Sequence, residues 1–501
     1  MSYALAGTMK RKKKRKKNIL SEYWLLVTLM VIGLAYRIYH LDVQSYWIDE
    51  SYSINAALAI LSYGYPLLES GALYLRDPLF HYMLAGIIGM FGLSEWSVRM
   101  VSVIFGTAFI PLIYYLGKEF GSRNIGYISA VLWTFLSIAI AWSRQARMYM
   151  AFAFFFYLAI LFFYKAIEER KAGYALSCGI ATIAASLMHS TGLFLFLIYG
   201  LYGIVIMMHS ITQIRTAIAK SYHLGLEWIR KHPMTILGLS AACGLIFFWR
   251  YAAIKGVLQT SIDYFGWYTS YFQQEYGFMI FFSIAGFLFF RRLKESLLFL
   301  IVICVMLYFV SFHQMLFAPR YLFVIIPLLV ILSAYSINHI IVRFGRMYRY
   351  LAGVPIMLIL IAAYASGIFT LVPQESYLLE RGTPQPDFKS AYAYVLENYE
   401  EGERVVSSYS TIAYLYLGRD ADYTLNFSLS RLPGTSLEYR HTGTDVYRGV
   451  EIFSVDSDLS GFVIIDSMAY SRVSGDVRRF LDSEMTVAYQ GKDIRVYYRP
   501  Y

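Results

Sequence analysis

Residues 10–38, KRKKKRKKNILSEYWLLVTLMVIGLAYRI, place a dense run of Lys and Arg directly before an apolar stretch that begins at Ile19. A basic flank of this kind holds its end of the chain on the cytoplasmic side of a membrane and attracts anionic lipid. No small-residue cleavage site follows the apolar stretch, so we expect an uncleaved anchor rather than a signal peptide. The stretch therefore predicts a membrane protein whose N-terminus, residues 1–18, is cytoplasmic.

The composition of the whole chain agrees with a membrane protein. Hydrophobic residues make up 58% of the sequence and charged residues only 15%, whereas soluble globular chains carry roughly 25% charged residues. The net charge of +11 owes much to the N-terminal basic run, so we expect membrane lipids rather than nucleic acid as its partner. The three cysteines are too far apart in the sequence for a metal-ligand cluster.

The apolar segments and the charges between them predict a topology. With the N-terminus inside, the connections that fall on the cytoplasmic side are rich in Lys and Arg, and the opposite ones carry few, apart from Arg144, Arg147 and Arg320. We therefore expect a polytopic α-helical protein with its transmembrane domain at 19–372 and its C-terminus outside. About eleven segments are long enough, or nearly so, to span a bilayer: roughly 19–38, 97–117, 124–143, 147–166, 174–191, 192–209, 234–252, 277–291, 296–313, 321–338 and 351–371.

One further apolar segment, from Leu79 to Phe91, is too short to span and suits a helix at the membrane interface. Asp77 and Pro78 precede it, and proline favours the first turn of a helix. Counting this segment as a span would move every later loop to the opposite side of the membrane, and the basic loops would then lie outside. We therefore place it in a long first external loop, about 39–96.

The composition changes after Pro373. Asp387 is a suitable cap for a helix whose apolar residues repeat with helical spacing. Short apolar runs at 404–406, 461–465 and 494–498 are typical of strands. About 130 residues are enough for a small domain, so we predict an extracytoplasmic α/β domain at 373–501.

Two carboxylates stand out in the first external loop, within the segment SYWIDESYS at 45–53. Charged side chains close to a membrane are costly and often functional, which makes Asp49 and Glu50 candidates for catalysis. The alternative is structural, with Asp49 as a helix N-cap and Trp47 in the interfacial aromatic belt. The two roles are compatible, and the local sequence does not decide between them.

Arginines at the outer ends of spans are the second group of candidates. Arg144 and Arg147 lie in the segment SRQARMY at 143–149, where the charge rule disfavours them. A guanidinium matches phosphate oxygens and keeps its proton, so a phosphate ligand is one explanation and lipid head groups are another. The same two explanations apply to Arg320. His189 is expected to bond either to a substrate or to a neighbouring helix. The sequence has no phosphate-binding glycine loop, zinc spacing or nucleophile elbow.

Taken in order, these segments resemble a known family. Asp49 and Glu50, then RDPL at 76–79, FGLSEWSVR at 91–99 and SRQARMY at 143–149 resemble the GT-C membrane glycosyltransferases. The most similar branch is the protein O-mannosyltransferase and lipid A aminoarabinose transferase group. The resemblance covers about 45–210, with a weaker match at 319–327. It implies an inverting transfer of one sugar from a polyprenyl- or dolichyl-phosphate donor to an extracytoplasmic hydroxyl of a protein, lipid or glycan, in a multi-pass protein of the plasma membrane or an endomembrane.

The resemblance also implies roles for the candidate residues. Asp49 would be the general base that accepts the proton of the acceptor hydroxyl, and Glu50 would orient the acceptor or share that proton. Arg144 and Arg147 would neutralise charge on the departing lipid phosphate. The remaining candidates for substrate binding are Tyr52, Asp77, Tyr149, His189 and Arg320.

The sequence departs from this group at one point. Mannosyltransferase relatives tend to have an acid shortly after the arginine of the third span, where this chain has Met148, Tyr149 and Met150. This weakens any scheme that needs a second acid or a metal, so no cofactor is expected with certainty and a divalent cation stays open. The tail lacks the Trp-Trp-Asp motif of oligosaccharyltransferases, which favours a monosaccharide. The competing hypotheses are a lipid-linked sugar transporter or flippase and a non-catalytic membrane assembly subunit, although transporters usually carry their charges near the bilayer midplane.

Overall fold

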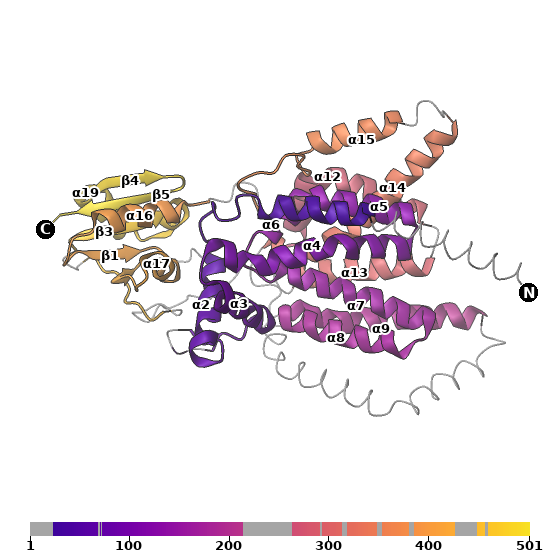
Figure 1. The fold of residues 1–501 in the computed structure, drawn as a ribbon, viewed down its shortest axis with the longest axis horizontal. Coiled ribbons are helices and arrows are strands. Elements are labelled where there is room, and N and C mark those ends of the chain that lie inside the picture. The colour runs from indigo at the N-terminus through magenta and orange to yellow at the C-terminus, as the bar shows by residue number, and fades with distance from the viewer. Residues whose placement is uncertain are drawn as a thin grey trace, which may run out of the picture. The chain divides into compact units, whose positions relative to one another are not determined.

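The computed structural model describes residues 24–68, 71, 73–213, 263–290, 293–312, 318–347, 353–379, 385–425, 448–455 and 459–500 (Figure 1). The chain forms two compact units that do not follow its order. The helical unit comprises Met1–Tyr39, Ser102–Arg144 and Met148–Tyr377. The loop–sheet unit comprises His40–Val101, Gln145–Arg147 and Leu378–Tyr501, so it contains the predicted first external loop together with the C-terminal residues.

Helices that lie along the predicted spans build the helical unit. Five helices in the described part of the chain are long and apolar enough to cross a membrane, and three shorter ones are also apolar. This is a multi-pass membrane protein. The predicted span at 234–252 lies outside the described residues, every other predicted span contains helix, and the number eleven stays a prediction. The elements are Trp24–Ile38, α4 (Glu95–Phe120), α5 (Arg123–Phe135), α6 (Ser137–Ser143), α7 (Tyr149–Glu169), α8 (Ala172–Met188), η1 (Ser190–Leu193), α9 (Phe194–Gln213), α12 (Phe265–Phe289), α13 (Leu293–Phe312), η2 (Pro319–Ile325), α14 (Ile326–Met347) and α15 (Gly353–Ala365).

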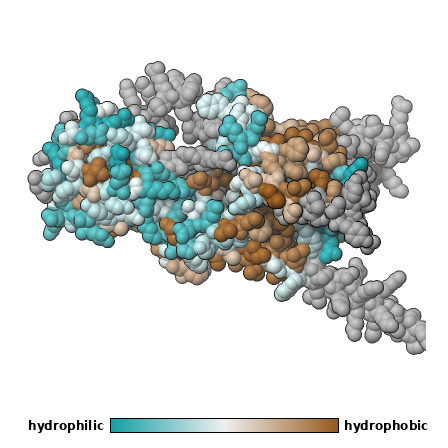
Figure 2. All heavy atoms as spheres, turned by 90° about the horizontal axis from the view of Figure 1, so that it is seen from above, coloured by the Kyte–Doolittle hydropathy of each residue, from teal (hydrophilic) through white to brown (hydrophobic). Residues whose placement is uncertain are grey.

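The outer surface of the helical unit is apolar. Figure 2 shows hydrophobic residues gathered over it, whereas the sheet region is largely hydrophilic. On α12, Phe281, Ile284 and Leu288 are 68%, 62% and 77% exposed. Lipid tails are a suitable environment for such a surface, because they solvate apolar side chains at no cost.

Small residues bring the backbones of α12 and α14 close together. The hydroxyl of Ser283 donates to the carbonyl oxygen of Leu329 at 2.9 Å, and that of Ser333 donates to Met279 at 3.2 Å. A Cβ atom on Gly286 would lie 1.8 Å from the carbonyl oxygen of Leu332. Small residues and interhelical hydroxyl bonds of this kind are typical of packed membrane helices.

A buried arginine joins the first helix to the bundle. Arg37 is 0% exposed; its Nε donates to the Ser143 hydroxyl at 3.0 Å and its Nη1 to the Gly33 carbonyl at 2.8 Å. Gly106 makes room for this pair, since a Cβ there would lie 2.0 Å from the Ser143 oxygen and 2.9 Å from Arg37 Nε. The C-terminal end of the first helix is therefore fixed against α4 and α6.

The loop–sheet unit has helices from the first loop and a mixed sheet from the C-terminal residues. The strand order is β2-β1-β3-β5-β4, with β1 parallel to β2 and β3, and β5 antiparallel to β3 and β4. The predicted strands and the helix after Asp387 are confirmed, and the Asp387 carboxylate accepts from Ser390 N–H at 3.1 Å as a cap. The elements are α2 (Ile48–Tyr63), α3 (Pro78–Phe91), α16 (Phe388–Asn398), β1 (Arg404–Ser407), α17 (Ser410–Leu417), β2 (Tyr423–Thr424), β3 (Gly461–Asp466), α18 (Ser467–Arg472), α19 (Gly475–Glu484), β4 (Thr486–Gly491) and β5 (Ile494–Arg499).

Buried apolar side chains pack against both faces of the sheet. The central strand β3 is buried along its whole length, Gly461–Asp466. On one face α16 and α17 contribute Tyr392 and Ile412, and on the other α19 contributes Phe480. Burial of apolar side chains on both sides gives the sheet its stability, and it fixes α16 and α17 on the same face.

Candidate active site

Helix α2 carries both candidate carboxylates in its first turn. The N-cap is Trp47, so the alternative in which Asp49 caps the helix is wrong. The capping bond comes from Glu50 instead, whose Oε2 accepts from Trp47 N–H at 3.0 Å. Glu50 reaches back in this way because it stands three residues after the cap. Asp49 is half-buried and lies in the first turn, two residues after the cap.

Glu50 is fully buried in an ion pair with Arg99 of α4. Oε1 accepts from Arg99 Nε at 3.0 Å and from the backbone N–H of Ala146 at 2.6 Å. Oε2 accepts from Arg99 Nη2 at 2.9 Å in addition to Trp47 N–H. The pair is bidentate, with side chains 1% and 0% exposed. Each carboxylate oxygen therefore has two donors, and a group so saturated is poorly suited to take a proton from an acceptor.

Arg99 also fixes the segment in front of α2. Its Nη1 donates to the carbonyl oxygens of Leu41 and Gln44 at 2.8 and 2.9 Å, and its Nη2 donates to Ser45 at 3.0 Å. A guanidinium offers five donors in a rigid fork, so one side chain satisfies several orphan carbonyls and a carboxylate at once. The loop at 41–45 and the first turn of α2 are thus held by one buried cation.

Arg147 lies against the same turn from another side. It is 3% exposed, and its Nη1 donates to the carbonyl of Asp49 at 3.0 Å and to the Ser53 hydroxyl at 2.7 Å. The neighbouring Ala146 N–H is already bonded to Glu50. The structure therefore brings Asp49, Glu50 and Arg147 together in one unit.

Arg144 belongs to the helical unit and has a different setting. Its Nη1 donates to the carbonyl oxygens of Tyr39 and Arg37 at 2.5 and 3.2 Å, and its Nη2 donates to the backbone carbonyl oxygen of Glu375 at 2.8 Å. A cation at the carbonyl end of a helix complements the helix dipole. Arg144 therefore stabilises the end of the first membrane helix.

Tyr149 and His189 lie together in the helical unit, with ring centroids 5.9 Å apart. The Nδ1 atom of His189 lies 2.7 Å from the Thr191 hydroxyl and accepts from Thr191 N–H at 3.2 Å. The ring of Tyr321 lies 6.0 Å from His189 and 5.7 Å from the Arg320 guanidinium. These four residues form an aromatic and cationic cluster, in which His189 also caps the short helix η1.

The last two candidates are Tyr52, which lies in α2, and Asp77, which directly precedes α3. Asp77 is confirmed as the residue that begins α3; it is 4% exposed and has φ of +49°, a left-handed conformation that is uncommon for a residue with a side chain. Tyr52 packs with Ala56 and Tyr74 in a small apolar cluster. Sparsely populated backbone conformations often occur at functional sites.

Tyr74 is a candidate site residue that the sequence did not predict. It is 6% exposed, its ring stacks on His81 at 5.3 Å, and its hydroxyl has no hydrogen-bond partner among the described residues. Burial raises the pKa of Tyr74, and the nearby Arg147 partly offsets that rise. The carboxylate of Asp49 also acts on this hydroxyl. A buried hydroxyl without a partner costs free energy, so this one is suited to bonding a ligand.

Comparisons with known proteins agree with this architecture. The family model described as Dolichyl-phosphate-mannose-protein mannosyltransferase matches residues 76–219. ArnT from Cupriavidus metallidurans in the apo state has a TM-score of 0.58 at 13% identity, with 95% of this chain and 98% of that chain covered. The chain has the GT-C fold. The resemblance seen in the sequence is thereby confirmed.

Two further GT-C structures are similar over most of this chain. ArnT from Cupriavidus metallidurans bound to undecaprenyl phosphate has a TM-score of 0.56 at 12% identity, covering 94% of this chain and 97% of that chain. AglB, an oligosaccharyltransferase from Archaeoglobus fulgidus in complex with an inhibitory peptide and a dolichol-phosphate, has a TM-score of 0.53 at 14% identity, covering 80% and 64%. No curated protein matches the sequence.

The family match and the site overlap only in part. Residues 76–219 include Arg99, Arg147 and His189 but not Asp49 or Glu50. No group of three His, Cys, Asp or Glu side chains suited to a metal ion occurs in the parts of the chain that the structure describes.

Proposed function

We propose that this protein is an inverting glycosyltransferase that moves one sugar from a polyprenyl- or dolichyl-phosphate donor to the hydroxyl of an extracytoplasmic acceptor, with Asp49 as general base. The observation that carries the proposal is the first turn of α2, where Asp49 is half-buried beside a carboxylate and an arginine that are both fixed by buried hydrogen bonds. The GT-C fold supports the reaction class, and the lipid phosphates held by ArnT and AglB support the donor class.

In the proposed reaction, Asp49 takes the proton of the acceptor hydroxyl while that oxygen attacks the anomeric carbon. The bond between this carbon and the lipid phosphate breaks, and the phosphate leaves with the electron pair. Attack from the opposite face inverts the anomeric configuration. A positioned general base contributes about 10²–10⁴-fold to the rate.

Glu50 and the two arginines take distinct parts in this scheme. Glu50 is a positioning residue, because its oxygens are saturated by Arg99 and two backbone N–H groups. We assign the stabilisation of the leaving phosphate to Arg147, because its guanidinium lies against the turn that carries Asp49 and donates to the Asp49 carbonyl and the Ser53 hydroxyl. Arg144 instead donates to backbone carbonyls of the helical unit. Preorganised cations of this kind stabilise charge that develops in the transition state.

The same proposal fixes an orientation in the membrane. The basic N-terminus is cytoplasmic, while α2 and the C-terminal domain are extracytoplasmic, in a plasma membrane or an endomembrane. The acceptor is a protein, lipid or glycan that carries a hydroxyl on that side. Glycosylation of an acceptor added to the outside of sealed, oriented vesicles, with none from the inside, tests this arrangement.

The test of the function is turnover by the full-length protein in lipid nanodiscs with a panel of polyprenyl-phosphate sugars and hydroxyl acceptors. We expect release of lipid phosphate with one donor class and an inverted anomeric centre in the product. Retention of configuration would refute the single-displacement step. Movement of the donor across the bilayer without cleavage would favour a flippase, and no reaction with any donor would favour an assembly subunit.

A further inference from the structure

Residues of the C-terminal α/β domain hold helix α2 directly. The hydroxyls of Ser51 and Thr411 lie 2.7 Å apart, and both side chains are buried. The amide nitrogen of Asn55, one turn further along α2, donates to the carbonyl of Ser51 at 2.8 Å and to that of Thr411 at 3.4 Å. The first turn of α17 is therefore bonded to α2 at Ser51 and Asn55, which follow Asp49 in the chain.

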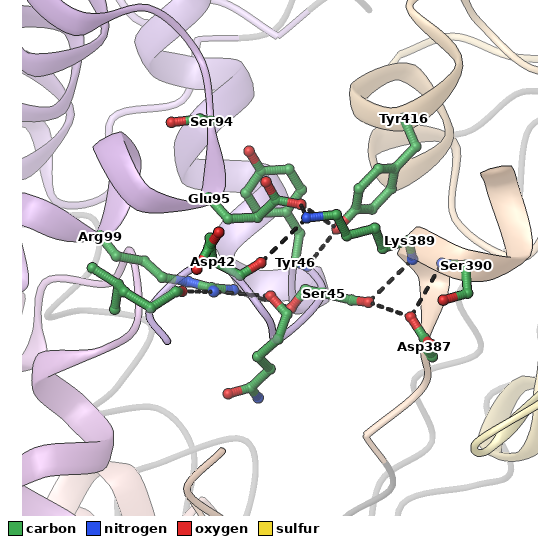
Figure 3. A network of polar contacts seen from close by, with 12 residues as sticks. Asp42, Ser45, Tyr46, Ser94, Glu95, Arg99, Asp387, Lys389, Ser390 and Tyr416 are labelled. Carbon is green, nitrogen blue, oxygen red and sulfur yellow. Dashed lines mark hydrogen bonds and ion pairs between the residues drawn. The ribbon is translucent and has the colours of Figure 1, made fainter. Parts of the chain in front are cut away.

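A second set of bonds holds the segment in front of α2 (Figure 3). The Ser45 hydroxyl donates to Oδ1 of Asp387 at 3.1 Å and accepts from Lys389 N–H at 3.1 Å. The backbone N–H of Tyr46 donates to the Tyr416 hydroxyl at 2.9 Å. Asp387 caps α16 and Tyr416 lies on α17, so both of these C-terminal helices contact the same short loop.

Glu95, at the start of α4, contacts both α16 and α17. Lys389 Nζ lies 3.3 Å from its carboxylate and donates to the carbonyl of Asp42 at 3.2 Å, and the Tyr416 hydroxyl donates to Glu95 at 3.3 Å (Figure 3). Burial, together with the charge of Glu95, raises the pKa of Tyr416. The hydroxyl thus keeps its proton and both donates to Glu95 and accepts from Tyr46.

Arg448 adds a third contact to α2. Its Nη1 donates to Oδ1 of Asn55 at 2.8 Å, and its guanidinium lies 3.5 Å from the Tyr414 ring centroid. It also pairs with Asp420, and its side chain is 4% exposed. Stacking on an aromatic ring and bonding to a carboxylate keep a guanidinium in a single orientation. Asn55 is thereby held on both sides.

We propose that the C-terminal α/β domain positions the general base, with Thr411 and Tyr416 as positioning residues that act through the loop at 42–46 and the first turn of α2. This inference rests on the proposed function. The contacts are directional, those of Thr411 are buried and those of Tyr416 are partly buried, and they flank Asp49 on both sides along the chain. Reacting groups must be held within a fraction of an ångström, and a misplacement of about 1 Å can lower the rate by as much as 10²-fold.

The test uses Thr411→Val and Tyr416→Phe, which keep the shape of each side chain and remove one hydroxyl. We expect each to lower kcat about tenfold while the KM for donor changes less than twofold, because transition-state geometry is lost and ground-state binding is not. Thr411→Ser restores the hydroxyl and should restore kcat. Tyr470→Phe is the matched control, since it removes a tyrosine hydroxyl that bonds Asp482 in the same domain but not α2.

A double-mutant cycle separates positioning of Asp49 from a general structural effect. In the Asp49→Asn background the Thr411→Val change should have no further effect on the rate, since the group that it positions is already gone. An equal loss in both backgrounds, or wild-type kcat in folded Thr411→Val and Tyr416→Phe, would overturn the inference. Thermal unfolding of each variant shows that it is folded.

Amide hydrogen exchange tests the same inference without turnover. The amides at 46–51 should exchange faster in Thr411→Val and Tyr416→Phe and at the wild-type rate in Tyr470→Phe, since local opening follows the loss of local bonds. Unchanged exchange at these amides would refute the inference even if the wild type transferred no sugar. Failure of the proposed function is distinct, because it appears as a wild type inactive with every donor.

Discussion

Replacing Glu50 with Gln probes the buried pair that holds the start of α2. The substitution keeps the shape and removes the charge, so Arg99 is left as a buried cation without its carboxylate. Each carboxylate oxygen of Glu50 accepts two hydrogen bonds. The four donors are two N–H groups of Arg99 and the backbone N–H groups of Trp47 and Ala146. A Gln amide in either orientation therefore points its NH2 group at two donors and loses two hydrogen bonds.

The size of the effect follows from the burial of the pair, whose side chains are 1% and 0% exposed. Removing one partner of a buried ion pair costs about 3–5 kcal/mol. A loss of this size lowers the melting temperature on the order of 10 °C for a unit of roughly 200 residues. Thermal unfolding of purified protein in nanodiscs measures this shift.

Glu484→Gln is the matched control for that measurement. Its ion pair with Arg499 spans 3.5 Å between side chains that are 50% and 34% exposed, and exposed pairs contribute about 0–1 kcal/mol. We expect no more than about 1 kcal/mol from this change. A Glu50→Gln protein as stable as Glu484→Gln would refute the claim that the buried pair fixes α2.

Three further changes test other parts of the structure. Tyr74→Phe removes a hydroxyl that has no partner among the described residues, so thermal stability should stay the same or rise while kcat/KM falls; a stability loss without a rate effect would contradict this. Gly286→Ala places a Cβ 1.8 Å from the Leu332 carbonyl oxygen, so it should separate α12 from α14 and cost about 1–3 kcal/mol in thermal unfolding; unchanged stability would contradict it. The hydrogen bond to Asp482 raises the pKa of Tyr470 from 10.0 to about 12. Because the folded-state pKa is the higher one, the stability from this bond is complete below pH 10 and is lost as the pH rises towards about 12. The pH dependence of unfolding should therefore be flatter above pH 10 in Tyr470→Phe, and an identical profile would contradict the assignment.

Local patterns in the sequence predicted much of the fold. Apolar runs of membrane length located the helices, since the requirement to cover the hydrocarbon core acts on each segment separately. The helix cap at Asp387 and the strand at 461–465 were also predicted correctly. Capping and strand formation depend on residues that are close in the sequence, so a local pattern is enough to indicate them. Helix α3 likewise began where Asp77 and Pro78 indicated.

The construction of the candidate site was predicted less well. The alternative in which Asp49 is the N-cap is wrong, because the cap is Trp47, two residues earlier, and Glu50 reaches back to it. Arg99 was recognised only as part of a motif, since its carboxylate partner lies 49 residues away in the chain. The bond between Ser45 and Asp387 spans 342 residues, a separation at which no periodic pattern operates.

The central claim is that Asp49 accepts the acceptor proton, and the transfer rate of Asp49→Asn under saturating donor tests it most directly. Asp476→Asn is the control, since its carboxylate is 72% exposed and pairs only with Arg479 on the surface of α19 among the described residues. We expect the rate of Asp49→Asn to fall about 10²–10⁴-fold, with donor affinity and melting temperature unchanged. A folded Asp49→Asn protein that transfers sugar at the rate of Asp476→Asn would contradict the assignment.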